Sequence, residues 1–196
     1  MIITISGVPG SGKSSVAKIL AEKLGYDRIY IGGLQREIAK QKGITLEQLQ
    51  KLEEKDPSLD KKVDDRIREN AMAKDNIIIE SRTAAGLFRK WKLKKSAVHV
   101  FLKCDLKVSA RRIFSQKNKE GCLVRNERQV LSEREQMKDV KDRMRSESKR
   151  YKKYYGFDCY DESLYDIIID TTKMTIKESA DAVLMLMKWP ALSRRS

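Results

Sequence analysis

The first fourteen residues constrain the fold of this chain more than any other stretch. A short β-branched run over 2–6 leads into Gly7-Val8-Pro9-Gly10-Ser11-Gly12-Lys13-Ser14, and apolar residues with a helical period follow as far as Gly25. A glycine-rich turn with this spacing, placed between a strand and a helix, is typical of a phosphate-binding P-loop. The sequence therefore predicts a nucleotide-binding site in an α/β protein.

The residue types of the loop explain how it would hold phosphate. Glycines allow backbone angles that turn successive N–H groups toward an oxyanion. The helix that follows adds its unpaired N–H groups and the positive end of its dipole. We expect Lys13 to reach the β- and γ-phosphates and the Ser14 hydroxyl to bind Mg²⁺.

Composition limits the class of protein and its partners. The chain has 196 residues, of which 40% are hydrophobic, enough for the core of one domain. Its formal net charge of +14 favours anionic partners, either nucleotides or nucleic acid. Cys104, Cys122 and Cys159 form no C-x-x-C pair and accompany a single histidine, so neither a disulfide framework nor a zinc site is predicted. No apolar run has the length of a membrane span, and we expect a soluble, cytoplasmic protein.

Strand and helix patterns alternate along the chain. Strands are predicted over about 2–6, 28–31, 76–79, 96–102 and 166–170, and Gly32-Gly33 is expected to break the second. Helices are predicted over about 34–41, from a cap at Thr45, and over 58–72, 106–116, 126–155 and 175–187, before a frayed tail at 188–196. This order implies an α/β fold with a five-stranded parallel sheet flanked by helices.

Two arginines come soon after strand ends: Arg36 follows the second strand and Arg82 the third. Since the carboxyl ends of parallel strands meet at one edge of a sheet, these guanidiniums could meet over one anion. The planar fork of arginine suits bidentate contact with phosphate. A second phosphate group, belonging to a phosphoryl acceptor, is the simplest ligand for this pair.

Arg143, Glu147 and Arg150 share one face of the long charged helix, because they are spaced i, i+4 and i+7. Two interpretations stay open for this face. It could be a solvated surface with local ion pairs, or it could carry arginines that close over a phosphoryl group during transfer.

Three other features have simpler expected roles. The basic run 89–95 is either a solvated connector or a nucleic-acid patch. Asp105 is expected to cap a helix, and His99 to pack in the core.

Taken together, the motifs resemble those of cytidylate kinases, most closely the compact archaeal-type members. The similarity covers about residues 1–187, and its motifs occur in the family's order: the P-loop, Gly32-Gly33-Leu34-Gln35-Arg36-Glu37, Asp56-Pro57-Ser58-Leu59-Asp60, Glu80-Ser81-Arg82-Thr83-Ala84 and 143–156. The resemblance implies a single P-loop nucleoside monophosphate (NMP) kinase domain over 1–187. It would have an NMP-binding helical segment at about 33–72 and a lid at about 115–155. The implied activity is transfer of the γ-phosphate of ATP to CMP or dCMP, with Mg²⁺ required. We expect the protein to be a monomer.

The resemblance also implies roles for individual residues. Those expected to hold ATP are Gly7, Val8, Pro9, Gly10, Ser11, Gly12, Lys13, Ser14, Ser15 and Arg112. Those expected to bind the acceptor are Arg36, Arg82 and Glu147, with Asp60, Asp64 and Arg66 in the segment that reads cytosine. Lys13, Arg143 and Arg150 would be catalytic, and Glu80 would orient a water on the Mg²⁺ bound by Ser14.

Three positions depart from the family pattern: Ser81 replaces a glycine, Gly33 an acidic residue and Gln116 an arginine. Two alternatives therefore stay open beside the leading hypothesis. One is a related P-loop kinase with another acceptor, such as AMP, UMP or a small metabolite. The other is a nucleotide-dependent RNA-binding protein, which the net charge and the basic run would suit.

Overall fold

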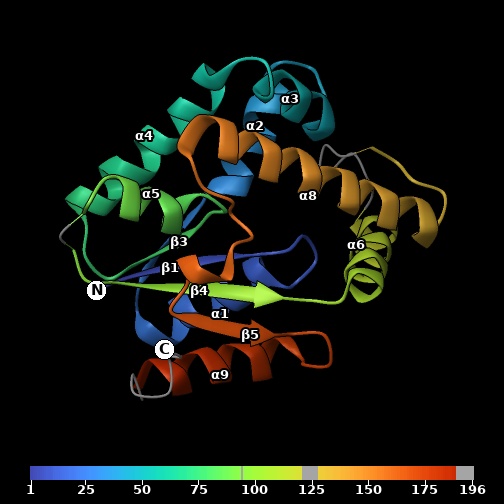
Figure 1. Cartoon of the computed structure of the whole chain (residues 1–196). Coiled ribbons are helices and arrows are strands. Elements are labelled where there is room, and N and C mark those ends of the chain that lie inside the picture. Colours follow the sequence, from blue (N-terminus) through green and yellow to red (C-terminus); the bar gives the residue numbers. More distant parts are fainter. Residues whose placement is uncertain (94, 121–127, 189–196) are drawn as a thin grey trace.

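The computed structural model describes residues 1–93, 95–120 and 128–188, in which strands and helices alternate (Figure 1). The strands are β1 (Ile2–Gly7), β2 (Asp27–Tyr30), β3 (Ile77–Glu80), β4 (Ala97–Lys103) and β5 (Ile167–Asp170). The helices are α1 (Lys13–Leu24), α2 (Ile31–Gln41), α3 (Leu46–Glu53), α4 (Pro57–Ala73), α5 (Ala84–Lys90), α6 (Leu106–Glu120), α8 (Glu133–Tyr155) and α9 (Ile176–Lys188), with a 3₁₀ turn at Glu162–Leu164.

The sheet is parallel throughout, in the order β2-β3-β1-β4-β5. Its central strand β1 aligns Ile3 with Ile78 of β3 on one side and with Val98 of β4 on the other. The carboxyl ends of β1, β2 and β3 therefore open at the same edge, where the P-loop begins. The predicted five-stranded parallel α/β fold is confirmed.

Both faces of the sheet are buried, which explains why its strands are continuous apolar runs. Ile3, Ile5 and Ile78 face one core, covered by α1 and α9. Ile77 and Ile79 face the other, covered by α2, α4 and α5. Figure 1 shows these two layers on opposite sides of the strands.

Helix α8 lies across the end of α3 and connects the part of the chain around α6 to the part around α2, α3 and α4 (Figure 1). The hydroxyl of Tyr154 donates to the carbonyl oxygen of Glu54 at 2.6 Å, and Ser146 donates to the Glu54 carboxylate. Just before α8, the backbone N–H of Arg128 donates to Oε2 of Glu47 on α3 at 3.1 Å. Segments far apart in sequence thus enclose one space above the carboxyl edge of the sheet.

Three predicted boundaries are wrong. Gly32-Gly33 does not end an extended segment; both residues lie in the first turn of α2, which begins at Ile31. The long charged helix begins at Glu133 rather than near 126, because the Ser132 hydroxyl caps it by accepting from the N–H of Glu135 at 3.2 Å. Helix α6 continues to Glu120, beyond the predicted end at Gln116.

The expected caps and the core histidine are confirmed. Thr45 forms a capping box with Gln48, and Asp105 accepts from the N–H of Lys107 at 2.8 Å at the start of α6. His99 is buried, with Nδ1 2.8 Å from Thr4 Oγ1.

The prediction for Cys122 lies outside the described residues, as does that for the tail 188–196 beyond Lys188, which is the last residue of α9 rather than part of a frayed tail. Within the described ranges, no helix is both long and apolar enough to cross a membrane.

Candidate active site

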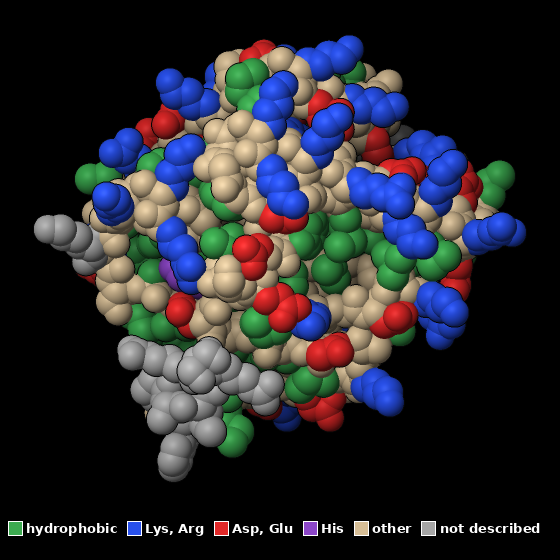
Figure 2. Space-filling view, viewed as in Figure 1, with side chains coloured by type: hydrophobic (Ala, Val, Ile, Leu, Met, Phe, Trp, Pro, Cys, Tyr) green, Lys and Arg blue, Asp and Glu red, His purple; other side chains and the backbone are tan. Residues whose placement is uncertain are grey.

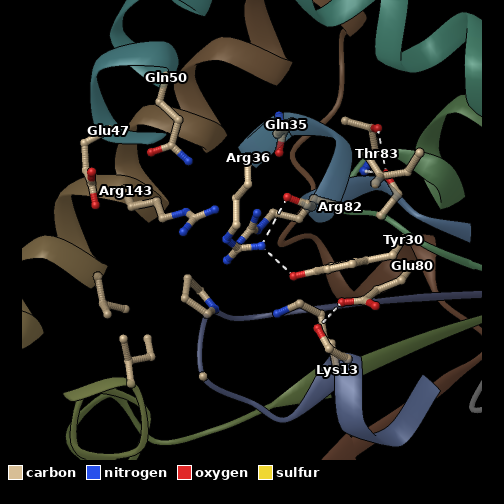
Figure 3. A pocket seen from close by; sticks show the side chains of 18 of the residues that line it. Lys13, Tyr30, Gln35, Arg36, Glu47, Gln50, Glu80, Arg82, Thr83 and Arg143 are labelled. Carbon is tan, nitrogen blue, oxygen red and sulfur yellow. Dashed lines mark hydrogen bonds between the residues drawn. The ribbon is translucent and has the colours of Figure 1, made fainter. Parts of the chain in front are cut away.

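A cavity of about 360 Å³ lies at the carboxyl edge of the sheet, between the P-loop, the ends of β2 and β3, and helices α2, α3, α4, α6 and α8 (Figure 3). Its charged lining residues are Lys13, Arg36, Glu47, Asp60, Asp64, Glu80, Arg82, Lys117, Asp139 and Arg143. Six of the residues predicted to hold ATP line this cavity: Pro9, Gly10, Gly12, Lys13, Ser14 and Ser15.

The P-loop has the backbone geometry that its glycines predict. Gly7 has φ 144°, and a Cβ there would lie 2.2 Å from the carbonyl oxygen of Leu102. Gly12 has φ 87° and caps the N-terminus of α1 in the left-handed region. The loop therefore turns tightly enough to present its N–H groups and the α1 N-terminus to the cavity.

Lys13 begins α1, and its ammonium donates to the carbonyl oxygen of Val8 at 2.6 Å. Burial, and next the positive charge of Arg82, lower the pKa of Lys13 to about 7, while Glu80 opposes this shift. An ammonium so close to losing its proton is strongly stabilised by an incoming phosphate, whose negative charge raises its pKa again.

The Ser14 hydroxyl donates to Glu80 Oε1 at 2.5 Å, so its lone pairs are left for a cation. Both side chains line the cavity, and the Glu80 carboxylate is also held by Arg28 Nη2 at 2.6 Å. No cluster of three or more His, Cys, Asp or Glu side chains suited to a metal occurs among the described residues. The Ser14 hydroxyl and the Glu80 carboxylate are oxygen donors of the kind that suits Mg²⁺, which keeps several waters and combines one or two protein groups with substrate phosphates.

Glu147 joins two arginines that line the cavity. Its Oε2 lies 2.9 Å from Arg82 Nε, and its Oε1 accepts from Arg143 Nε at 3.0 Å. The hydroxyl of Tyr160 donates to Oε2 at 2.5 Å. Although burial raises the pKa of Glu147, Arg82 and Arg143 outweigh it and lower that pKa to about 2. An ionised carboxylate therefore positions both guanidiniums from behind the cavity wall.

Arg36 reaches the cavity from α2, and Figure 3 shows its guanidinium beside those of Arg82 and Arg143 and above Lys13. The predicted pair of Arg36 and Arg82 thus lines one cavity with the P-loop. The side chain of Gln50 faces Arg143, and with its amide oxygen on that side it accepts from Nε and Nη2 at 3.1 Å.

Arg150 lies deeper than Arg143 and is absent from the cavity wall. Its guanidinium is buried between two carboxylates, with Nη1 2.6 Å from Glu53 Oε2 and Nε 3.1 Å from Asp60 Oδ2. It also donates to the hydroxyl of Tyr151 at 3.0 Å. This network ties α8 to α3 and α4.

Asp60 and Asp64 both lie on the cavity side of α4. Burial raises the pKa of Asp60 to about 7, partly offset by Arg150. Burial likewise raises the pKa of Asp64 to about 6, and the hydroxyl of Tyr155 partly offsets this shift. A buried acceptor with a raised pKa gains from a ligand N–H that supplies the missing hydrogen bond.

The remaining predicted residues lie away from the cavity wall. Arg112 is turned toward the loop after β5, where Nη2 donates to the carbonyl oxygens of Thr171 at 2.9 Å and Met174 at 3.3 Å. Arg66 is on the exposed face of α4. Gly7, Val8 and Ser11 support the P-loop from behind, with the Ser11 carbonyl accepting from Thr171 Oγ1 at 3.1 Å.

Sequence reasoning missed a set of polar residues that line the cavity: Tyr30, Gln35, Glu47, Gln50, Lys117, Gln136 and Asp139. Glu47 and Gln50 are spaced i, i+3 on α3, and this shared face was a usable signal. Gln136 and Asp139 repeat the same spacing on α8. Lys117 is buried, and its ammonium donates to the carbonyl oxygen of Arg128 at 3.0 Å.

The basic run fits a connector, since several of its side chains bind the chain itself. Arg89 donates to the carbonyl oxygen of Ser163 at 2.7 Å, and Lys95 to that of Lys74 at 3.2 Å. Lys94 lies outside the described residues. Figure 2 shows that, on the face of the molecule in view, Lys and Arg side chains are scattered, with Asp and Glu between them.

Comparisons with known proteins point to one family. Residues 2–173 match the model of the cytidylate kinase-like family. A cytidylate kinase of Sulfolobus acidocaldarius is 38% identical over 94% of this chain and 92% of its own length. One of Halobacterium salinarum is 35% identical over 94% of this chain and 88% of its own.

Solved structures give the same fold at lower identity. A shikimate kinase from Bacteroides thetaiotaomicron superposes with a TM-score of 0.63 at 18% identity, covering 96% of this chain and 98% of the other. From the P-loop geometry, the arginine-lined cavity and the match over most of its length, the chain belongs to the cytidylate kinase-like family.

Proposed function

We propose that the protein transfers the γ-phosphate of ATP to CMP or dCMP, giving ADP and CDP or dCDP. The observation that carries this proposal is a single cavity lined by the P-loop Lys13 on one side and by Arg36, Arg82 and Arg143 on the other. A donor triphosphate needs the first group of contacts and an acceptor phosphate the second.

Catalysis here consists of positioning and electrostatic stabilisation. In phosphoryl transfer, negative charge is spread over the equatorial oxygens of the moving group. Lys13 reaches the cavity from α1 and Arg143 from α8, and both would face that charge. Glu147 keeps Arg82 and Arg143 oriented before substrate arrives, so little reorganisation accompanies the reaction.

Mg²⁺ completes the proposal, with the hydroxyl of Ser14 as its protein ligand and Glu80 holding a bound water. When bound, the ion neutralises charge on the β- and γ-phosphate oxygens. Glu80 accepts the Ser14 hydrogen, which would leave the lone pairs of the hydroxyl oxygen available to the ion.

Asp64 and Asp60 are proposed to recognise the cytosine edge. A carboxylate accepts a hydrogen bond from the exocyclic amine of cytosine, whereas uracil presents a carbonyl oxygen at that position. Val63 lies between these carboxylates on α4 and also lines the cavity, so it offers an apolar contact to the ring.

Two segments of the chain are proposed to form the acceptor side of the site and its lid. We propose that 33–72, which includes α3 and α4, is the NMP-binding segment and that 115–155, with α8, is the lid. The bond from the Arg128 N–H to Glu47 and the bond between Ser146 and Glu54 support contact between the two. A cytoplasmic monomer remains the prediction from the sequence.

A coupled assay of ADP formation tests the proposal against a panel of CMP, dCMP, UMP, AMP and GMP. We expect CMP and dCMP to give the highest kcat/KM, with Mg²⁺ required. No turnover above the ATPase background with any member would overturn it, and a clear preference for AMP or UMP would replace the acceptor.

A further inference from the structure

We infer that Tyr30 is a positioning residue for the acceptor phosphate: its ring and hydroxyl hold the Arg36 guanidinium in place, in a space that Gly32 and Gly33 leave open. The inference rests on the proposed function, which makes Arg36 a phosphate-binding group.

The contacts of Tyr30 with Arg36 are direct. Arg36 Nη1 donates to the Tyr30 hydroxyl at 2.5 Å and to the carbonyl oxygen of Gly32 at 3.1 Å. The centre of the guanidinium lies 5.9 Å from the centre of the Tyr30 ring. Figure 3 shows Tyr30 extended below Arg36, with its hydroxyl pointing to the guanidinium. Two polar contacts on one nitrogen fix the direction in which the rest of the fork points.

The glycines of α2 are shaped to this ring. A Cβ on Gly33 would lie 2.7 Å from Tyr30 Cδ1, and one on Gly32 would lie 3.0 Å from Cε2. Any side chain at position 33 would therefore move the ring. Two consecutive glycines lower the stability of a helix. Here they leave the space in which the Tyr30 ring packs.

The same ring also contacts the donor side of the site. The guanidinium of Arg28 lies 4.9 Å from the Tyr30 ring centre, and its Nη2 is 2.6 Å from Glu80 Oε2. Glu80 in turn accepts from Ser14 of the P-loop. Tyr30 thus contacts both Arg28, which supports Glu80, and Arg36, which would bind the acceptor phosphate.

A fixed guanidinium loses less rotamer freedom when it binds phosphate, so pre-organisation increases affinity. The gain applies to ligands that carry the phosphate and leaves the base contacts unchanged. CMP and cytidine differ by this group alone, so the ratio of their affinities isolates the role of Tyr30.

The experiment compares the wild type with Tyr30→Phe, which removes only the hydroxyl. Calorimetric titration with CMP and with cytidine gives both affinities, and steady-state kinetics give KM and kcat. We expect CMP affinity to fall about 5- to 10-fold, the size of one ordinary net hydrogen bond, with cytidine affinity and KM for ATP unchanged. The matched control is Tyr26→Phe, which changes a tyrosine packed against the core covered by α1 and α9.

Gly33→Ala tests the ring itself. Its methyl group should displace Tyr30 and raise KM for CMP, but in a Tyr30→Ala background the same change should have no further effect. Additive effects of the two changes would contradict the inference.

The two proposals fail in different measurements. Absence of turnover by the wild type across the nucleotide panel overturns the proposed function. If the wild type is active and Tyr30→Phe leaves the ratio of CMP to cytidine affinity unchanged, or lowers both affinities equally, the role of Tyr30 is overturned.

Discussion

Arg82 Nε lies 2.9 Å from Glu147 Oε2, which joins the arginine that follows β3 to the helix that carries Arg143. The two arginines approach the cavity from different parts of the chain, and one buried carboxylate sets the position of both. The pre-organisation of the acceptor side therefore depends on the charge of Glu147.

This ion pair should make stability fall in acid. The pKa of Glu147 is lowered from 4.5 to about 2 in the folded protein, so its contribution is present above pH about 4.5 and is lost as the pH falls toward 2. We expect the difference in Tm between the wild type and Glu147→Gln to be large at pH 6 and to shrink below pH 4. Thermal unfolding across this pH range measures it, and a difference independent of pH would contradict the prediction.

Arg143→Ala should lower kcat by on the order of 10²-fold, the effect of removing one preorganised charge-stabilising donor. Binding of ATP, which uses the P-loop, should change little. Arg145→Ala is the matched control, because Arg145 is exposed on the same helix. Equal kcat values for the two variants would overturn the catalytic role of Arg143.

Arg150→Ala should act first on stability. Its removal leaves Glu53 and Asp60 buried without their cation, which typically costs about 3–5 kcal/mol in unfolding free energy. Urea unfolding measures this loss, and adding Glu53→Gln should recover part of it by removing one unpaired charge. The resemblance also implies a drop in kcat on the order of 10²-fold, which a low temperature assay of the folded variant can test. Full activity there would leave Arg150 with the structural role alone.

ATP binding should take up protons above neutral pH. With its pKa lowered to about 7, Lys13 is largely neutral at pH 8 in the free protein, and bound phosphates raise that pKa. Binding at pH 8 should therefore be accompanied by uptake of up to about one proton, and affinity should weaken as the pH rises from 7 to 9. Calorimetry in buffers with different ionisation enthalpies gives the number of protons. Lys13→Arg should abolish the uptake.

Asp64→Asn should reduce the preference for cytosine. An amide can donate as well as accept, so it discriminates poorly between the amine of cytosine and the carbonyl oxygen of uracil. We expect the ratio of kcat/KM for CMP over UMP to fall on the order of 10-fold. Asp65→Asn on the exposed face of α4 is the control. The wild-type preference should also weaken below pH 6, where Asp64 becomes protonated.

Much of the fold could be predicted because its signals are local. Apolar runs mark β1 and β3 as strands buried on both faces, and the P-loop fixes the first turn. The start of α2 was missed, because Gly32-Gly33 is a break signal that packing against Tyr30 overrides. The start of α8 had a readable signal, a serine at 132 followed three residues later by Glu135.

The site was predictable where a residue follows a strand end or belongs to a motif. Lys13, Arg36 and Arg82 were found in this way, and all three line the cavity. The partners of Arg150 were not, because Glu53 lies 97 residues away in sequence and no local pattern links them. Ser81, in place of a glycine, needs no special backbone angle; its hydroxyl accepts from the N–H of Thr83 at 3.1 Å.

Helix α8 ends at Gly156, which takes a left-handed φ of 82°, and Arg143 lies thirteen residues before that point. At 1.5 Å per residue this is a lever of about 20 Å, so a tilt of about 5° would shift Arg143 by roughly 1.7 Å. A displacement of that size is enough to break the contact of Arg143 with a phosphoryl group and so to slow its transfer. Because Ser146, Arg150 and Tyr154 of the same lever hold α3 and α4, one small rotation would adjust the catalytic arginine and the acceptor pocket together.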